Sequence, residues 1–107
     1  MRYRTAKVSL DGQAVGILEE LAGGTTRFTY SNQWLRRSGA VPISLILPLR
    51  EEPYESAGLH PFFENLLPEG WLLEVSARKL KLSKADAFGL LLAMGSDCVG
   101  AVEIVAE

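Results

Sequence analysis

Cysteine and histidine are almost absent from this sequence of 107 residues, which holds one of each, Cys98 and His60. A single cysteine cannot form a disulfide within the chain, so a disulfide-stabilised secreted scaffold is excluded. A zinc site built from cysteine and histidine needs three or four such ligands, which excludes that kind of metal site as well. We expect the lone His60, in a proline-bearing loop, to be a surface or capping residue rather than a general base.

Long apolar runs and an excess of charge are also missing. The longest apolar stretches, near residues 43–49 and 90–94, are far shorter than a membrane span, and the polar N-terminus has no signal-peptide core. The net charge is −2, and we interpret the basic group at residues 78–84 as a solvated helix face. The sequence therefore predicts a cytoplasmic protein that binds neither membranes nor nucleic acid directly.

What is present is the composition of an ordinary globular domain. Hydrophobic residues make up 48% of the chain and charged residues 22%, so there is enough apolar surface to offset the entropy lost on folding. The length fits one compact unit. We expect a single domain that spans residues 1–107.

The first third of the chain has the alternating pattern of three antiparallel strands. In the first of them, Val8 and Leu10 lie on one face, and Asp11-Gly12 then suits a tight hairpin turn. The predicted strands cover residues 3–10, 13–18 and 25–30.

A short helix and a fourth strand are predicted next. Ser31 is placed to cap a helix over residues 32–37, which lays Trp34 against the sheet. Residues 43–47 have the pattern of a strand closed by Pro48, since proline cannot donate a ladder hydrogen bond. Residues 50–61, which contain two prolines and a glycine, predict a long loop.

The second half predicts helices and a last strand. Pro68 suits the first position of a helix whose apolar stripe centres on Leu73. Ser83, with Asp86 three residues later, is placed to cap a second helix that buries Phe88, and residues after Gly100 read as a strand. The predicted fold class is α+β: a small antiparallel sheet of about five strands with three helices packed on it.

Catalytic chemistry finds no support in the sequence. The adjacent carboxylates Glu19-Glu20 and Glu51-Glu52 point apart on a strand or turn, so neither pair is preset for acid–base work. Residues 95–100 have the glycine spacing of a phosphate-binding loop, but they lack its lysine and run from helix into strand. We therefore predict no catalytic residue, no cofactor site and no metal site.

One predicted helix face carries an aromatic residue away from the core. At about 100° per residue, Trp71 lies roughly 160° from Leu73, and Val75 and Arg78 fall near Trp71. A Trp, a Val and an Arg on one outward face have the composition of a binding hot spot. Packing of Trp71 beneath the loop at residues 50–61, or a helix buried on both sides, is the alternative.

Two long motifs resemble a known family. Residues 61–70, PFFENLLPEG, are similar to the "PFF-acidic-NLLPEG" signature of HipA-type serine/threonine kinases, and residues 88–102, FGLLLAMGSDCVGAV, are similar to their "F-x-LL-x-x-x-G-x-D-C-x-GAV" motif. Residues 44–50 and 11–16 resemble the family's "SLSLPLR" strand and its opening hairpin. The resemblance covers nearly the whole chain and implies the first N-terminal subdomain, which precedes the nucleotide-binding loop and catalytic aspartates of the full-length kinases. Trp71, directly after the first motif, departs from the family pattern.

The resemblance implies a partner protein rather than an enzyme. In split members of the family this subdomain is a separate antitoxin, often called HipS, of a shortened kinase. The implied partners are a HipA/HipT-type kinase and a DNA-binding HipB-like protein in the same complex. We expect Glu69, Gly70 and Trp71, with Val75 and Arg78, to contact the kinase. A non-inhibitory structural subdomain of a longer kinase, or an adaptor to the DNA-binding antitoxin, are the alternatives.

Overall fold

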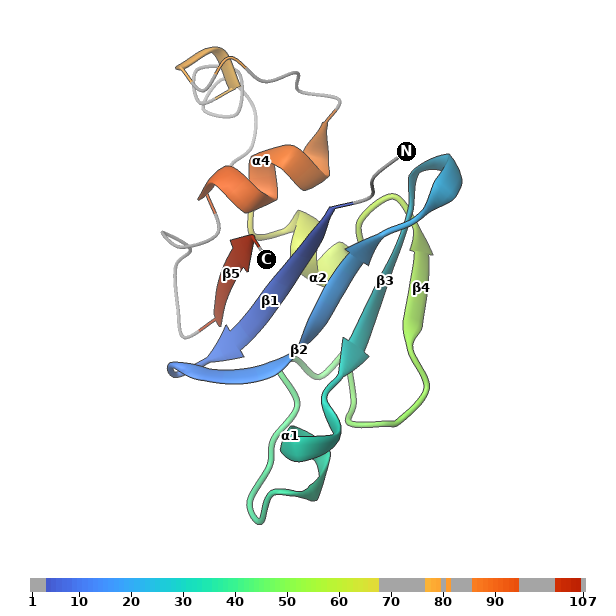
Figure 1. Cartoon of the computed structure of the whole chain (residues 1–107), viewed down its shortest axis with the longest axis vertical. Coiled ribbons are helices and arrows are strands. Elements are labelled where there is room, and N and C mark those ends of the chain that lie inside the picture. Colours follow the sequence, from blue (N-terminus) through green and yellow to red (C-terminus); the bar gives the residue numbers. More distant parts are fainter. Residues whose placement is uncertain (1–3, 68–76, 80, 82–85, 95–101, 107) are drawn as a thin grey trace.

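A computed structural model describes residues 4–67, 77–79, 81, 86–94 and 102–106. Within these residues, five strands form one antiparallel sheet in the order β4-β3-β2-β1-β5 (Figure 1). The strands are β1 (Thr5–Leu10), β2 (Gln13–Glu20), β3 (Thr25–Tyr30), β4 (Tyr54–Ala57) and β5 (Val102–Ala106). The helices of this part are the 3-10 turn η1 (Ala22–Gly24), α1 (Asn32–Arg36), α2 (Pro61–Glu64) and α4 (Ala87–Met94), and residues 77–79 are also helical. The predicted α+β class, with its small antiparallel sheet, is confirmed.

The β1–β2 hairpin forms at the predicted turn, where Asp11 and Gly12 have positive φ angles of 51° and 80°. Val8 pairs with Gly16, but Ser9 pairs with Ala14, so the ladder contains a bulge. The extra residue is Val15 of β2, where the consecutive residues Val15 and Gly16 are both buried. In β1, Val8 and Ser9 are also both buried. The strict alternation predicted for the first strand is therefore wrong at Ser9.

Strand β3 and helix α1 follow the prediction closely. Thr26, Phe28 and Tyr30 form the buried face of β3. Ser31 caps α1, because its Oγ accepts a hydrogen bond from the backbone N–H of Trp34 at 3.1 Å. The Trp34 side chain is buried, and α1 lies beyond the end of β3 (Figure 1).

Residues 43–47 do not form the predicted strand. They make a tight turn in which the N–H of Leu47 donates to the carbonyl of Ser44 at 3.0 Å, with an isolated bridge between the same two residues. Pro42 and Pro48 stand on either side, and neither can donate a hydrogen bond to a neighbouring strand. The buried groups of this run bond instead to Tyr30, whose hydroxyl accepts the N–H of Ile43 and donates to the carbonyl of Leu47.

The fourth strand is β4, which lies inside the segment predicted as a loop. It pairs antiparallel with β3, from Thr25 opposite Ala57 to Phe28 opposite Tyr54. Its residues are half-buried or exposed, in alternation. The prediction of a continuous loop over residues 50–61 is wrong because an edge strand needs only one apolar face and one partner.

Helices α2 and α4 contribute to one core with the sheet. Phe63 of α2 packs on Phe28 of β3, with 5.4 Å between the ring centroids, and Phe88 of α4 belongs to the same buried cluster. Asp86 caps α4 by accepting the N–H of Gly89 at 3.1 Å. The predicted capping partner Ser83 and the predicted helix start at Pro68 lie outside the described residues. The last predicted strand is confirmed as β5, which pairs with β1.

Candidate partner-binding surface

The structure describes only one of the five residues predicted to contact a partner. Glu69, Gly70, Trp71 and Val75 lie outside the described residues. Arg78 is exposed on the helical turn of residues 77–79, immediately after Ala77, which is buried. The surface centred on Trp71 therefore stays a prediction.

Another surface is visible in the described part, at residues 41–47, which we call the apolar turn. Leu45 is 94% exposed, Ile46 is 53% exposed and Val41 is 50% exposed. Ile43 and Leu47, in contrast, are buried in the core cluster. The backbone thus sends two apolar side chains inward and three outward, and a leucine as exposed as Leu45 contributes nothing to the core.

Two buried aromatic residues hold the apolar turn from inside. The Tyr30 hydroxyl donates to the carbonyl of Leu47 and accepts the N–H of Ile43, the latter at 3.1 Å. The indole N–H of Trp34 donates to the carbonyl of Val41 at 3.0 Å. Burial raises the pKa of Tyr30, so its hydroxyl stays protonated and able to donate at neutral pH. The turn is fixed to the sheet and to α1 at three backbone positions.

Arg37 carries positive charge near one end of the apolar turn, since it lines the same space as Val41. The Arg37 guanidinium lies over the Trp34 indole, 5.4 Å from the ring centroid, and Arg36 is exposed on α1. No acidic residue occurs from Leu21 to Arg50. The ion pairs within the described residues are Arg4–Glu20, Arg4–Asp86 and Arg27–Glu19. This segment is therefore locally positive on a chain whose net charge is −2.

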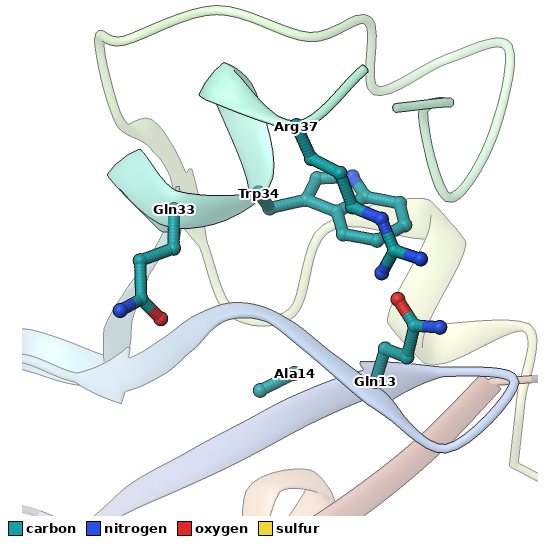
Figure 2. A pocket seen from close by; sticks show the side chains of 5 residues that line it. All are labelled: Gln13, Ala14, Gln33, Trp34 and Arg37. Carbon is teal, nitrogen blue, oxygen red and sulfur yellow. The ribbon is translucent and has the colours of Figure 1, made fainter. Parts of the chain in front are cut away.

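A shallow cavity of about 280 Å³ lies between the β1–β2 hairpin and α1 (Figure 2). Gln13, Ala14, Gln33, Trp34 and Arg37 line it, and the Gln13 amide points toward the Arg37 guanidinium. An adjoining space of about 170 Å³ shares Gln13, Trp34 and Arg37 and reaches Val41. The hollow therefore runs up to the apolar turn, and its guanidinium and amide offer hydrogen-bond donors suited to a carboxylate.

An ionic cluster at the end of β1 and β2 away from their hairpin turn has a structural role. Arg4 contacts Glu20 at 2.7 Å and Asp86 at 2.8 Å, which joins the starts of β1 and α4 to the end of β2. Hydrogen bonds from the guanidinium lower the pKa of both carboxyl groups, and the carboxylates in turn raise the pKa of Arg4. Carboxylates that a guanidinium keeps ionised, with a lowered pKa, are poor acid–base catalysts near neutral pH.

His60 is a helix cap, as expected from the sequence. Its Nδ1 accepts the backbone N–H of Phe62 at 3.1 Å, at the start of α2. Burial lowers its pKa, which favours the neutral imidazole that can accept this bond. Among the described residues, no three side chains of His, Cys, Asp or Glu gather to hold a metal ion. In the same part of the chain, no helix has the length and apolar character to cross a membrane.

Comparison with known proteins identifies the family. The model of the HipA N-terminal domain matches residues 6–105, so the chain belongs to the HipA N-terminal domain family. A Haemophilus influenzae protein named "Uncharacterized protein" is 36% identical, with 97% of this chain and 93% of that protein covered. A Sinorhizobium fredii protein named "Putative kinase Y4mE" is 37% identical over the whole chain, which spans only 26% of its length.

Solved structures agree with this assignment. The chain is similar to a structure described as the N-terminal domain of HipA toxin, with a TM-score of 0.74 and 33% identity, and the match covers 100% of this chain and 97% of that one. It is also similar to HipA in the toxin–antitoxin complex of Shewanella oneidensis with HipB and operator DNA, with a TM-score of 0.74 and 28% identity. That match covers 94% of this chain and 23% of the other.

Sequence reasoning missed the apolar turn because residues 43–47 have the composition of a strand. The signal that could have revealed it is the pair of prolines, Pro42 and Pro48, that bracket the run. A proline has no backbone N–H to donate to a neighbouring strand, so prolines at both ends weaken the prediction of a strand. The anchoring roles of Tyr30 and Trp34 leave no signal in the sequence, since both residues also fit an ordinary core.

Proposed function

We propose that this chain is an antitoxin-like protein that binds a HipA/HipT-type serine/threonine kinase and restrains it. The observation that carries the proposal is the Haemophilus influenzae relative, of which this chain covers 93%. The HipA N-terminal domain thus makes up nearly all of that protein, as expected for a small subunit made apart from a kinase. In this role the chain is a cytoplasmic binding protein and not an enzyme.

The proposed mechanism uses the predicted contact residues. The domain docks beside the kinase N-lobe, and Glu69, Gly70 and Trp71 reach toward the cleft between the lobes, supported by Val75 and Arg78. An indole wedged there opposes closure of the lobes around ATP. Such a shift of the open–closed equilibrium needs only a few kcal/mol of differential binding, about a hundredfold for 3 kcal/mol.

The test is autophosphorylation of the HipA-type kinase of the same organism, alone and with this protein at equimolar concentration. We expect the protein to suppress autophosphorylation and Trp71→Ala to relieve the suppression. Val105→Ser, which changes an exposed residue on β5, is the matched control and keeps full suppression. Suppression by Trp71→Ala equal to that of the original protein would refute the wedge.

A second candidate is a non-inhibitory structural domain of a HipA-like kinase. It is favoured by the Sinorhizobium fredii relative, since this chain matches only 26% of that longer protein. A third is an adaptor to a HipB-like DNA-binding protein, favoured by the likeness to HipA in a complex with HipB and operator DNA. Binding without suppression of the kinase supports the structural domain, and loss of HipB-like binding in Arg78→Ala supports the adaptor.

A further inference from the structure

We propose that the apolar turn, together with Arg37 near its Val41 end and the neighbouring Arg36, is a docking surface that seats Leu45 and Ile46 in an apolar pocket surrounded by aspartate or glutamate side chains on the partner kinase. This inference rests on the proposed function and adds the chemistry of the partner surface that the chain recognises.

The exposure of the apolar turn is maintained by buried contacts. Leu45 is 94% exposed, while the backbone on either side of it is held by the Tyr30 hydroxyl at Ile43 and Leu47. A loop already fixed in its final shape loses little conformational entropy when it binds. Moving a leucine from full exposure into a pocket strengthens binding roughly tenfold or more.

The positive charge of Arg36 and Arg37 indicates which side chains surround that pocket on the partner. Arg36 and Arg37 form no ion pair among the described residues, and Arg37 lines the cavity together with Gln13 (Figure 2). A guanidinium and a side-chain amide together donate to both oxygens of a carboxylate. The complementary surface therefore carries acidic residues around an apolar centre.

The same charges disfavour a second copy of this chain as the occupant. A two-fold dimer through this surface would set the patch against itself, which places Arg36 and Arg37 of one copy near those of the other. Like charges facing one another across an interface oppose association. Nucleic acid is also a poor fit, because the outermost side chains of the patch, Leu45 and Ile46, are apolar and offer nothing to a phosphate.

The experiment measures the affinity of the HipA-type kinase of the same organism for four forms of the full chain by titration calorimetry. They are the original protein, Leu45→Asp, the double variant Arg36→Glu/Arg37→Glu, and the control Val105→Ser. We expect Leu45→Asp to weaken binding at least thirtyfold. The double variant weakens it about tenfold and flattens its salt dependence, and the control stays within twofold. Leu45→Asp does not threaten the fold, since this side chain has no core contact, and circular dichroism checks each variant.

The outcomes separate this inference from the proposed function. If the original protein binds the kinase and both surface variants bind equally well, the docking surface is refuted and the proposed function stands. If the original protein does not bind the kinase, the proposed function itself fails and this inference fails with it.

Two further measurements test other occupants. If sedimentation velocity shows that the free protein is a dimer and that Leu45→Asp is a monomer, the inference is overturned in favour of a second copy of the chain. If the protein sediments with vesicles of phosphatidylserine and phosphatidylcholine and Leu45→Asp does not, the inference is overturned in favour of a membrane surface. Absence of both effects, with weakened kinase binding, supports it.

Discussion

The Tyr30 hydroxyl accepts a hydrogen bond from the backbone N–H of Ile43 at 3.1 Å. It also donates to the carbonyl of Leu47, so one side chain on β3 holds both ends of the turn that displays Leu45. Both bonds are buried, and both backbone groups would lack these partners without the hydroxyl. The positions of the exposed side chains of the apolar turn therefore depend on the buried residue Tyr30.

Removing this hydroxyl with Tyr30→Phe is expected to lower the free energy of unfolding by about 1–3 kcal/mol, because two buried backbone groups lose their partner. The edge-to-face packing on Phe28, with centroids 4.9 Å apart, is kept. Urea unfolding measures the loss, and hydrogen exchange at the Ile43 amide is expected to speed up. Tyr54→Phe is the matched control, since that hydroxyl bonds the exposed carbonyl of Pro48, and its cost should stay below about 1 kcal/mol. Equal costs for the two variants would contradict the anchoring role of Tyr30.

The cluster of Arg4, Glu20 and Asp86 predicts a loss of stability in acid. The pKa values of both carboxyl groups are lowered in the folded protein, mainly by hydrogen bonds from Arg4. Their contribution is therefore complete above the unfolded-state values, near pH 4–4.5, and disappears as the pH falls through the lower folded-state values. Asp86→Asn removes the charge but keeps a good helix cap, so we expect it to cost about 0.5–1 kcal/mol at pH 7 and almost nothing at pH 2.

The control for this experiment is Glu103→Gln, an exposed carboxylate on β5 outside the cluster. Urea unfolding at pH 7 and at pH 2 should show no pH-dependent difference between this variant and the original protein. An Asp86→Asn cost that is the same at both pH values would show that the aspartate acts through its cap alone.

The cap formed by His60 predicts a second pH effect, near neutrality. A protonated imidazole cannot accept the N–H of Phe62, and burial already lowers the pKa of His60. Its stabilising contribution is complete above the unfolded-state pKa of about 6.5 and is lost as the pH falls through the lower folded-state value. His60→Ala should cost about 0.5–2 kcal/mol at pH 8. His60→Asn keeps a capping oxygen, so it should retain most of the stability and flatten the pH dependence between 5 and 7 in thermal unfolding.

The close approach of β2 and β3 at Gly16 leaves no room for a side chain at this position. A Cβ at this position would lie 2.4 Å from the Thr29 carbonyl oxygen and 2.8 Å from the Phe28 ring. Because the carbonyl belongs to the paired strand, the backbone must move to admit the methyl group. We expect Gly16→Ala to lower the free energy of unfolding by about 1–3 kcal/mol, measured in urea. A change below about 0.5 kcal/mol would show that the strands separate without cost.

Elements defined by neighbouring residues were predicted correctly. Asp11 and Gly12 form the hairpin turn, Ser31 caps α1, and Thr26, Phe28 and Tyr30 face the core as their alternation indicates. Each signal acts within a few residues, through the φ angles, donors and side-chain period of the local chain. The long motifs also placed the chain in its family from sequence alone.

The sequence by itself thus determined the fold class, the hairpin, the first cap and the family. Tertiary structure decided the rest: the bulge at Val15 in β2, β4 on the edge of the sheet, β5 beside β1, and the turn at residues 43–47 where a strand was predicted. These features depend on which distant segments meet. An apolar run forms a strand only if a neighbouring strand has unpaired backbone N–H and C=O groups to bond with it. The N–H of Ile43 and the carbonyl of Leu47 bond instead to the hydroxyl of Tyr30.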